Sequence, residues 1–515
     1  MRFFALLWVS SFVWAQLSSD QIDDLAERTR STFQVPGLAI AVVQDGKIVH
    51  MKGYGLRSVD KPESVDEHTL FGIASLSKAF TNLALAILVE RSKLDWSDRV
   101  IDHDPAFRLY DPYVTQEFQI VDLVTHRSGL PLGAGDLMQF PESDFSRDEI
   151  LANLRFLKPS SSFRSHFDYD NSLYLEAGLV LEKVSGMSWQ EAIQTSIFQP
   201  LGMTESYPIL PADFQGNMAQ PHALVDGKPT PIKPYRFTVG APAGAIHSNL
   251  HDMTQYMLAQ LAGTQYGADL AQRLVSADQD RFLKTAQTLL AVSESAAQER
   301  NRHFSAYALG WFLNDDYGVF SLSHTGGLPG MVCKLTLLPD LKVGVLVLTN
   351  QESGYAFNAI TDQIVRAYAG QPEVDQVAEN KARQDKREAG ADEILDEVEK
   401  KWKANAKLPA LDWVQGLEGT YQDDWYGKVS IEKRDKELWL IFARTPALQG
   451  PIRYLHGNTF RVKWQDRSLN ADAYLTFQLN PEGKIEGFDM KAISPLTDFS
   501  YDFHHLHLEK QEAVE

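Results

Sequence analysis

Ser75-Leu76-Ser77-Lys78 stands at the head of an apolar helical run, residues 79–89, directly after the stretch 70–74. Residues three apart on a helix share a face, so the Lys78 amine is expected within hydrogen-bond reach of the Ser75 hydroxyl. A serine hydroxyl needs a base to take its proton before it can attack a carbonyl carbon. The bare spacing is not specific, so partners elsewhere in the chain must support it. The same spacing also occurs in the pairs Ser58 with Lys61 and Ser430 with Lys433.

A second polar group, Tyr169-Asp170-Asn171, precedes a predicted helix that begins near Ser172. A loop position just before a helix can direct these side chains into a cleft. A nearby lysine cation favours the charged form of a phenol, so Tyr169 is a candidate to share its proton. Asn171 is a candidate to hold a substrate amide. Alone, the triplet is more typical of a helix cap beside a core tyrosine.

A third group, His324-Thr325-Gly326-Gly327, follows a predicted strand at 319–323. Glycines at such a place let a substrate backbone approach the strand edge. The amides of Gly327 and Ser75 are candidates to stabilise a developing oxyanion. A strand-ending turn is the alternative interpretation of this group by itself.

Taken in order, the three groups resemble the three motifs of the serine β-lactamase and penicillin-binding-protein superfamily, in its class C-like branch. The resemblance covers about residues 22–369. Further stretches agree with it, namely 123–130, 242–244 with Ser248, 326–330 and 345–350.

The resemblance implies that Ser75 is the acylated nucleophile and that Lys78 with Tyr169 forms the base system. It implies that Asn171 positions substrate and that the Ser75 and Gly327 amides form the oxyanion hole. It implies no cofactor. Which of the Lys78 and Tyr169 side chains takes the first proton stays open, because the two would titrate as a coupled pair.

The third motif departs from the usual family pattern, because it begins with His324 rather than with lysine. A lysine offers a permanent cation to a substrate carboxylate, whereas a histidine is only partly charged near neutral pH. The resemblance implies a serine hydrolase, here an exported one, that cleaves an amide or ester. It favours a D-aminopeptidase-like peptidase or amidase, because relatives with histidine at this position include such peptide-cleaving members. An esterase or β-lactamase of the same fold is the first alternative. A penicillin-binding-type receptor or scaffold with little turnover is the second.

The expected fold class is α/β (α+β), with an antiparallel sheet flanked by helices and a helical subdomain. Asp45-Gly46 between two apolar runs, 37–44 and 47–54, predicts a β-hairpin after an opening helix at 20–33. Further periodic segments are expected to form helices or strands, and the hairpin is expected to pair with the last strands. The helices are expected at 172–184, 189–197, 250–262 and 357–368, and the strands at 319–323, 332–338 and 343–348.

The end of the catalytic region is followed by two different patterns. Residues 371–409 alternate in charge and predict a charged helical linker after a hydrolase domain at 16–370. Residues 410–515 contain short alternating segments that predict strands at 428–433, 438–443, 459–464, 473–479 and 485–491. These strands predict a small all-β barrel that resembles a lipocalin-like domain. This tail is expected to lie near the cleft and restrict substrate size, or to mediate self-association into a homo-oligomer.

The chain has 515 residues and a net charge of -19, which disfavours nucleic acid as a partner. Residues 1–15 combine a basic start, an apolar core and a small residue at Ala15, as in a signal peptide cleaved after that residue. A periplasmic or secreted location without stable membrane insertion is therefore expected, and the substrate is a small molecule or a peptide. The single cysteine, Cys333, is expected in the core.

No metal site is expected. His504, His505 and His507 are interpreted as part of an ordinary terminal strand. On such a strand, His505 and His507 would share a face. His126 and His247 are assigned structural roles.

Overall fold

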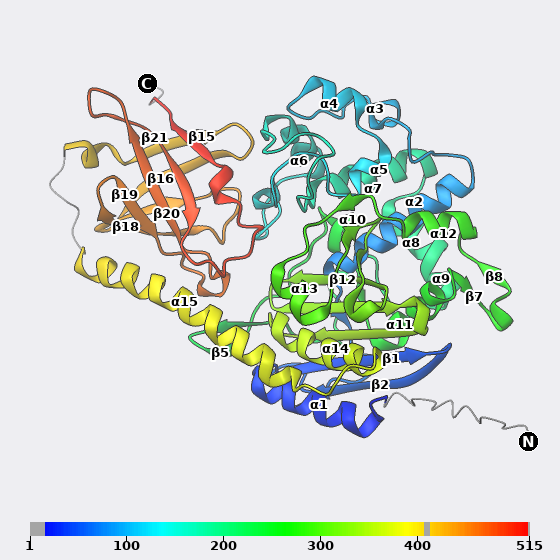
Figure 1. Cartoon of the computed structure of the whole chain (residues 1–515). Coiled ribbons are helices and arrows are strands. Elements are labelled where there is room, and N and C mark those ends of the chain that lie inside the picture. The colour runs from blue at the N-terminus through cyan, green and yellow to red at the C-terminus, as the bar shows by residue number, and fades with distance from the viewer. Residues whose placement is uncertain (1–15, 406–411, 513–515) are drawn as a thin grey trace, which may run out of the picture.

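The computed structural model describes residues 16–405 and 412–512. The predicted signal peptide lies outside these residues. Within them, no helix combines the length and the apolar character needed to cross a bilayer. Figure 1 shows a mixed α/β body, a closed barrel beside it and one long helix running along both.

The body is built on an eight-stranded antiparallel sheet of order β2-β1-β14-β13-β12-β11-β10-β9. The predicted hairpin pairs with the last strand, Leu38 opposite Thr349, as expected. In chain order the strands of this sheet are β1 (Gly37–Gln44), β2 (Lys47–Gly55), β9 (Thr288–Leu289), β10 (Ser305–Tyr307), β11 (Phe312–Asn314), β12 (Ser321–Leu328), β13 (Met331–Leu338) and β14 (Val343–Thr349).

The two faces of the sheet bury different side chains, because successive residues of a strand point to opposite sides. On one face, Leu38, Ile40 and Val42 pack with α1 (Ser19–Thr32) and α14 (Gly354–Tyr368), the first and last helices in the sequence of the body. The opposite face packs on the larger helical layer that carries the candidate site.

Helices and short strand pairs make up the rest of the body. The helices are α2 (Ser77–Glu90), α3 (Val100–His103), α4 (Pro112–Glu117), α5 (Ile120–Leu123), α6 (Arg147–Asn153), α7 (Ser172–Ser185), α8 (Trp189–Ile193), α9 (Gln199–Leu201), α10 (Ala241–Gly244), α11 (Leu250–Leu261), α12 (Ala277–Leu283) and α13 (Glu294–Arg300). The paired strands are β3 (Phe71–Gly72) with β6 (His247–Ser248), β4 (His222–Val225) with β5 (Lys228–Pro231), and β7 (Gln265–Tyr266) with β8 (Gln272–Arg273).

The long helix α15 (Gln376–Ala404) connects the two parts and contacts both of them. It packs against α1 and α14 at its start and against strand β18 of the barrel at its end. Its Trp402 is buried under two guanidinium groups, with Arg453 4.6 Å and Arg461 5.1 Å from the ring centre.

The barrel is closed by antiparallel pairing of β15 with β22, which leaves no free sheet edge. Its strands are β15 (Gly419–Asp423), β16 (Gly427–Arg434), β17 (Glu437–Ile441), β18 (Gln449–His456), β19 (Thr459–Val462), β20 (Ala473–Leu479), β21 (Ile485–Ala492) and β22 (His507–Lys510). Sequence periodicity predicted β16, β17, β19, β20 and β21 and missed the other three.

Two local predictions are wrong. The strand expected to end at Ser323 instead continues as β12 through Leu328, because its backbone pairs with β13 along that length. His504 and His505 lie in a 3-10 turn before β22, so His505 and His507 do not share a strand face.

Candidate functional site

The candidate nucleophile lies on a strained turn between β3 and α2. Ala74, the residue before Ser75, has a φ of 47°, a left-handed conformation that costs energy for a residue with a side chain. Ser75 lines a cavity of about 560 Å³, whereas α2 behind it is almost wholly buried. The turn therefore presents the Ser75 hydroxyl to the cavity.

Lys78 is fully buried one helical turn after Ser75. In its protonated form, the amine has an acceptor for each of its three hydrogen atoms. Its Nζ lies 3.1 Å from Ser75 Oγ, 2.7 Å from Asn171 Oδ1 and 3.0 Å from the carbonyl oxygen of Ala243. Burial lowers the pKa of Lys78 from 10.5 to about 7, although the nearby carboxyl groups of Asp136 and Asp170 oppose the shift. A substantial fraction of this amine is therefore neutral near pH 7.

Tyr169 lies beside the same amine, with its ring centre 4.8 Å from Lys78 Nζ. Burial raises the pKa of Tyr169 well above its ordinary value, and a hydrogen bond with Ser75 opposes this shift only in part. Burial therefore outweighs the effect that a nearby cation was expected to have on the phenol, and Tyr169 retains its proton near neutral pH. Its phenol can donate a hydrogen bond at the Ser75 oxygen.

Asn171 directly precedes α7, as predicted, but both halves of its amide are used inside the protein. Its Oδ1 accepts from Lys78, and its Nδ2 donates to Asp136 Oδ2 at 2.7 Å. The side chain therefore orients Lys78 and is not free to bind a substrate amide through both atoms.

The third motif forms one wall of the cavity as part of β12. Thr325 and Gly327 face the accessible side of the strand, and Gly326 faces the buried side. A Cβ at Gly326 would overlap the carbonyl oxygen of Ile73 and lie 2.7 Å from Cys333 Sγ. Only glycine at this position lets β12 approach the turn that carries the nucleophile.

His324 is buried and uncharged, which corrects the expectation of partial charge. Burial, together with the neighbouring Lys78, lowers the pKa of His324 to about 3. Its ring nitrogens contact the Tyr307 hydroxyl at 3.1 Å and the Thr325 carbonyl oxygen at 2.6 Å. His324 therefore supplies no cation to a substrate near neutral pH.

Several residues of the site lie outside the three main motifs. His126 accepts a hydrogen bond from the Asp170 amide and packs against Tyr169 with 4.2 Å between ring centres. Asp136 follows two glycines in a short turn, which was the only local signal for it. The barrel also contributes to the cavity, through residues 468–470, 496 and 498–501.

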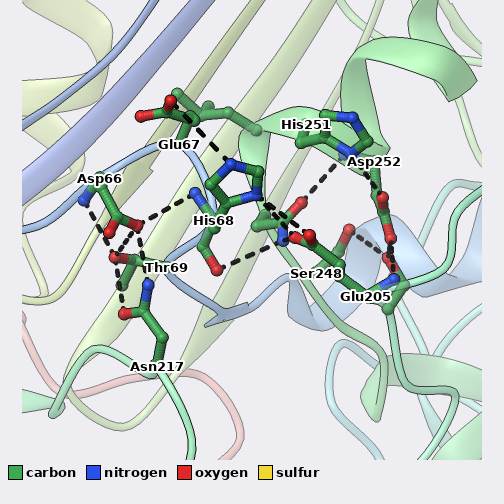
Figure 2. Close-up of polar contacts among 12 residues, drawn as sticks. Asp66, Glu67, His68, Thr69, Glu205, Asn217, Ser248, His251 and Asp252 are labelled. Atoms are coloured by element: carbon green, nitrogen blue, oxygen red, sulfur yellow. Dashed lines mark hydrogen bonds and ion pairs between the residues drawn. The ribbon is translucent and has the colours of Figure 1, made fainter.

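A separate cluster of polar side chains, Figure 2, joins three segments of the body outside the cavity. His68 Nδ1 lies 2.9 Å from Glu205 Oε2, and His251 Nδ1 lies 3.0 Å from Asp252 Oδ1. The side-chain atoms of Glu205, His251 and Asp252 that could bind a metal ion lie within 4.8 Å of one another. In the described part of the chain, this is the one group of three or more such residues. Their hydrogen bonds tie the segment before β3 to the start of α11, and the strained turn begins from that strand.

Comparison with known proteins identifies two regions. The family model described as Beta-lactamase matches residues 22–370, and one described as Domain of unknown function (DUF3471) matches residues 405–510. Unguisins hydrolase ungD' of Aspergillus campestris is 29% identical over 378 residues, 68% of this chain and 66% of that protein. Protein flp of Staphylococcus aureus (strain N315) is 28% identical over 344 residues, 66% of this chain and 64% of that protein. The chain thus spans just under two thirds of the length of these relatives.

Two solved structures share the fold. An octameric penicillin-binding protein homologue from Pyrococcus abyssi superposes with a TM-score of 0.61 and 20% identity, covering 96% of this chain and 100% of that one. A class C beta-lactamase superposes with a TM-score of 0.55 and 21% identity, covering 69% of this chain and 96% of that one. The first match extends over both body and barrel.

Proposed function

Because the chain belongs to the Beta-lactamase family, we propose that it is a serine hydrolase that cleaves an amide or ester through a covalent acyl-enzyme at Ser75. The preferred substrate class is a peptide or amide, as for a D-aminopeptidase-like enzyme, with esters as easier acyl donors. The name of the relative ungD' describes a hydrolase, in agreement with this reaction type.

The observation that carries the proposal is the buried contact between Lys78 Nζ and Ser75 Oγ at 3.1 Å. A lysine whose pKa lies near 7 is a competent general base at neutral pH, unlike an exposed lysine. The raised pKa of Tyr169 makes the tyrosine a poor first base. Lys78 is thus the group that accepts the Ser75 proton.

The reaction then proceeds in two balanced halves. Ser75 Oγ forms a bond to the substrate carbonyl carbon as its proton moves to Lys78, and the carbonyl oxygen takes up the negative charge. Collapse of this intermediate breaks the bond to the leaving nitrogen or oxygen, which receives the proton from Lys78, with the Tyr169 phenol beside the path. A water molecule repeats the sequence on the acyl-enzyme and releases Ser75 with its proton.

The cavity wall supports a substrate without an obligatory carboxylate. Its lining is more apolar than polar and includes eight Phe and Tyr residues, and its acidic members are Glu352 and Asp498. No lysine or arginine of the described residues lines it. Together with a neutral His324, this lining offers apolar contact and disfavours anions.

A labelling and turnover experiment tests the proposal. A fluorophosphonate should label the wild-type protein once, and Ser75→Ala should lose both labelling and hydrolysis of p-nitrophenyl esters, amino-acid amides and short peptides. Ser430→Ala is the matched control, since Ser430 with Lys433 has the same spacing but lies on β16. Turnover by Ser75→Ala would refute the mechanism, and labelling without turnover on the whole panel would favour the receptor alternative.

We further propose that the protein is exported, on the strength of the pattern in residues 1–15. Expression of the full chain should yield a mature protein that begins at Gln16 outside the cytoplasm, as read by N-terminal sequencing. An intact Met1 on the active protein would contradict this.

Self-association is also proposed, because the similar protein from Pyrococcus abyssi is described as octameric and matches the chain over both domains. Light scattering after size-exclusion chromatography should give a mass at least twice that of one mature chain, which is somewhat below the 57.9 kDa of the full sequence. A monomeric mass at micromolar concentration would rule the assembly out.

A further inference from the structure

A segment of the barrel enters the candidate site between β21 and β22. Phe499 packs edge-on against Tyr169, with 5.8 Å between the ring centres. A Cβ at Gly133 would lie 2.8 Å from the Phe499 carbonyl oxygen, so this glycine leaves room for the segment. The barrel thus reaches a residue that contacts the nucleophile.

The same segment makes hydrogen bonds to one turn of the body, both to the backbone of that turn and to its Asp136 side chain. The carboxylate of Asp502, which is fully buried, accepts from the Gly135 amide at 2.9 Å and from the Leu137 amide at 3.0 Å. These amides flank Asp136, whose Oδ2 accepts from the Ser500 hydroxyl at 3.0 Å. Three hydrogen bonds from the barrel therefore fix the position of a single carboxyl group.

Asp136 in turn determines how Asn171 is oriented. An amide side chain has one accepting and one donating end, and the two ends are fixed by their partners. Because Asp136 accepts from Nδ2, the Oδ1 end of Asn171 must face Lys78. Without an acceptor at Asp136, the amide loses the contact that selects this orientation.

We propose that Ser500 and Asp502 of the barrel are positioning residues of the hydrolase site, acting through Asp136 and Asn171 on the orientation and basicity of Lys78. The inference rests on the proposed function of Lys78 as the base. The barrel is then part of the catalytic apparatus, beyond any effect on substrate size.

The charges around Lys78 set the direction of the expected effect. Asp136 and Asp170 raise the pKa of Lys78 against the larger effect of burial. Burial, then Asp502 and Asp170, raise the pKa of Asp136, whereas Asn171 and Ser500 lower it by hydrogen bonding. The other titratable groups that face this pair are Tyr169, Tyr174, His126, His324, Tyr235 and Tyr501.

Two substitutions separate this role from a structural one. Asp136→Asn removes a charge that favours protonated Lys78, so the acidic limb of the kcat/KM profile should move to lower pH. Ser500→Ala removes a donor that favours the ionised Asp136 carboxyl, and should move the limb in the same direction by less. Ser500→Ala should also lower kcat about tenfold, with less change in KM, as expected for one lost hydrogen bond to a charged group. Asp136→Asn retains an accepting amide oxygen, so its effect is read from the acidic limb.

The controls distinguish this inference from the proposed function. Ser500→Thr retains the hydroxyl and should restore the wild-type profile, and Ser430→Ala on the far strand β16 should leave it unchanged. If Ser75→Ala is inactive but Ser500→Ala and Asp136→Asn keep the wild-type kcat and acidic limb, the inference is overturned and the proposed function stands. A loss of kcat in Ser500→Ala that Ser500→Thr does not restore would also overturn it.

Discussion

Replacing Lys78 with methionine should abolish hydrolysis and, at the same time, remove a pH-dependent cost to folding. The pKa of Lys78 is 10.5 in an unfolded chain and about 7 in the folded protein, because burial disfavours the charged amine. Between these values the unfolded chain holds a proton that the folded protein has released. The stability of the wild-type protein therefore rises with pH across this window. Below it the destabilising effect of Lys78 is at its full size and no longer depends on pH.

The size of the effect follows from the width of the window. One pKa unit corresponds to about 1.4 kcal/mol, so the full contribution of this one side chain is about 5 kcal/mol. Methionine fills a similar volume but leaves the Asn171 and Ala243 oxygens without a donor, which costs about 1–3 kcal/mol for each. These costs do not depend on pH, so the difference between the two proteins isolates the lysine.

Urea denaturation at pH values from about 7 to about 10 measures this difference. The free energy of unfolding of the wild-type protein should gain on that of Lys78→Met by about 1.4 kcal/mol for each pH unit. Lys47→Met, at an exposed position on β2, is the matched control and should show no such slope. A constant difference between the wild type and Lys78→Met would refute the assignment of a depressed lysine pKa and, with it, the general base.

Three further predictions concern the same site. In a pH-rate profile, the kcat/KM of the wild-type protein should rise with pH through about 7 as Lys78 loses its proton. Lys78→Arg should be inactive across the same profile, because a guanidinium does not deprotonate. His324→Gln should leave the midpoint of that acidic limb in place, since the pKa of His324 is already lowered to about 3; a displaced limb would show a charged histidine. Gly326→Ala should lower the labelling rate and destabilise the fold by about 1–3 kcal/mol through overpacking, which a lower thermal midpoint would show. Gly390→Ala on α15, where a Cβ meets open space, should be neutral or stabilising.

The sheet was predictable because its signals are local. The Asp45-Gly46 turn and the uniformly apolar β1 and β14 report directly on a hairpin and a buried strand. The extent of β12 was not predictable, because Gly326 and Gly327 read as a turn and only pairing with β13 extends the strand through them. The missed barrel strands β15, β18 and β22 contain Gly, Pro or charged residues that weaken the period-two pattern.

Only those residues of the site that lie in the three motifs were predictable from the sequence. Ser75 and Lys78 are three residues apart, so helix geometry alone brings their side chains together. Asp136 and Ser500 are 364 residues apart in the chain, and nothing in either neighbourhood identifies the other as its partner. The sign of the pKa shifts at Tyr169 and His324 was likewise hidden, because it depends on burial by distant segments.

The barrel and the basicity of Lys78 are linked by the exclusion of water. In the proposed mechanism Lys78 is a base at neutral pH because it is buried, and the Tyr169 ring beside it is in contact with the barrel segment. The barrel segment covers the Asp136 turn through Phe499 and accepts hydrogen bonds from the Gly135 and Leu137 amides through Asp502, so that both buried donors are paired. A body without its barrel would expose the Gly135 and Leu137 amides and admit water toward Asn171. Its lysine would then regain a higher pKa and lose activity at neutral pH, even toward substrates too small to contact the barrel.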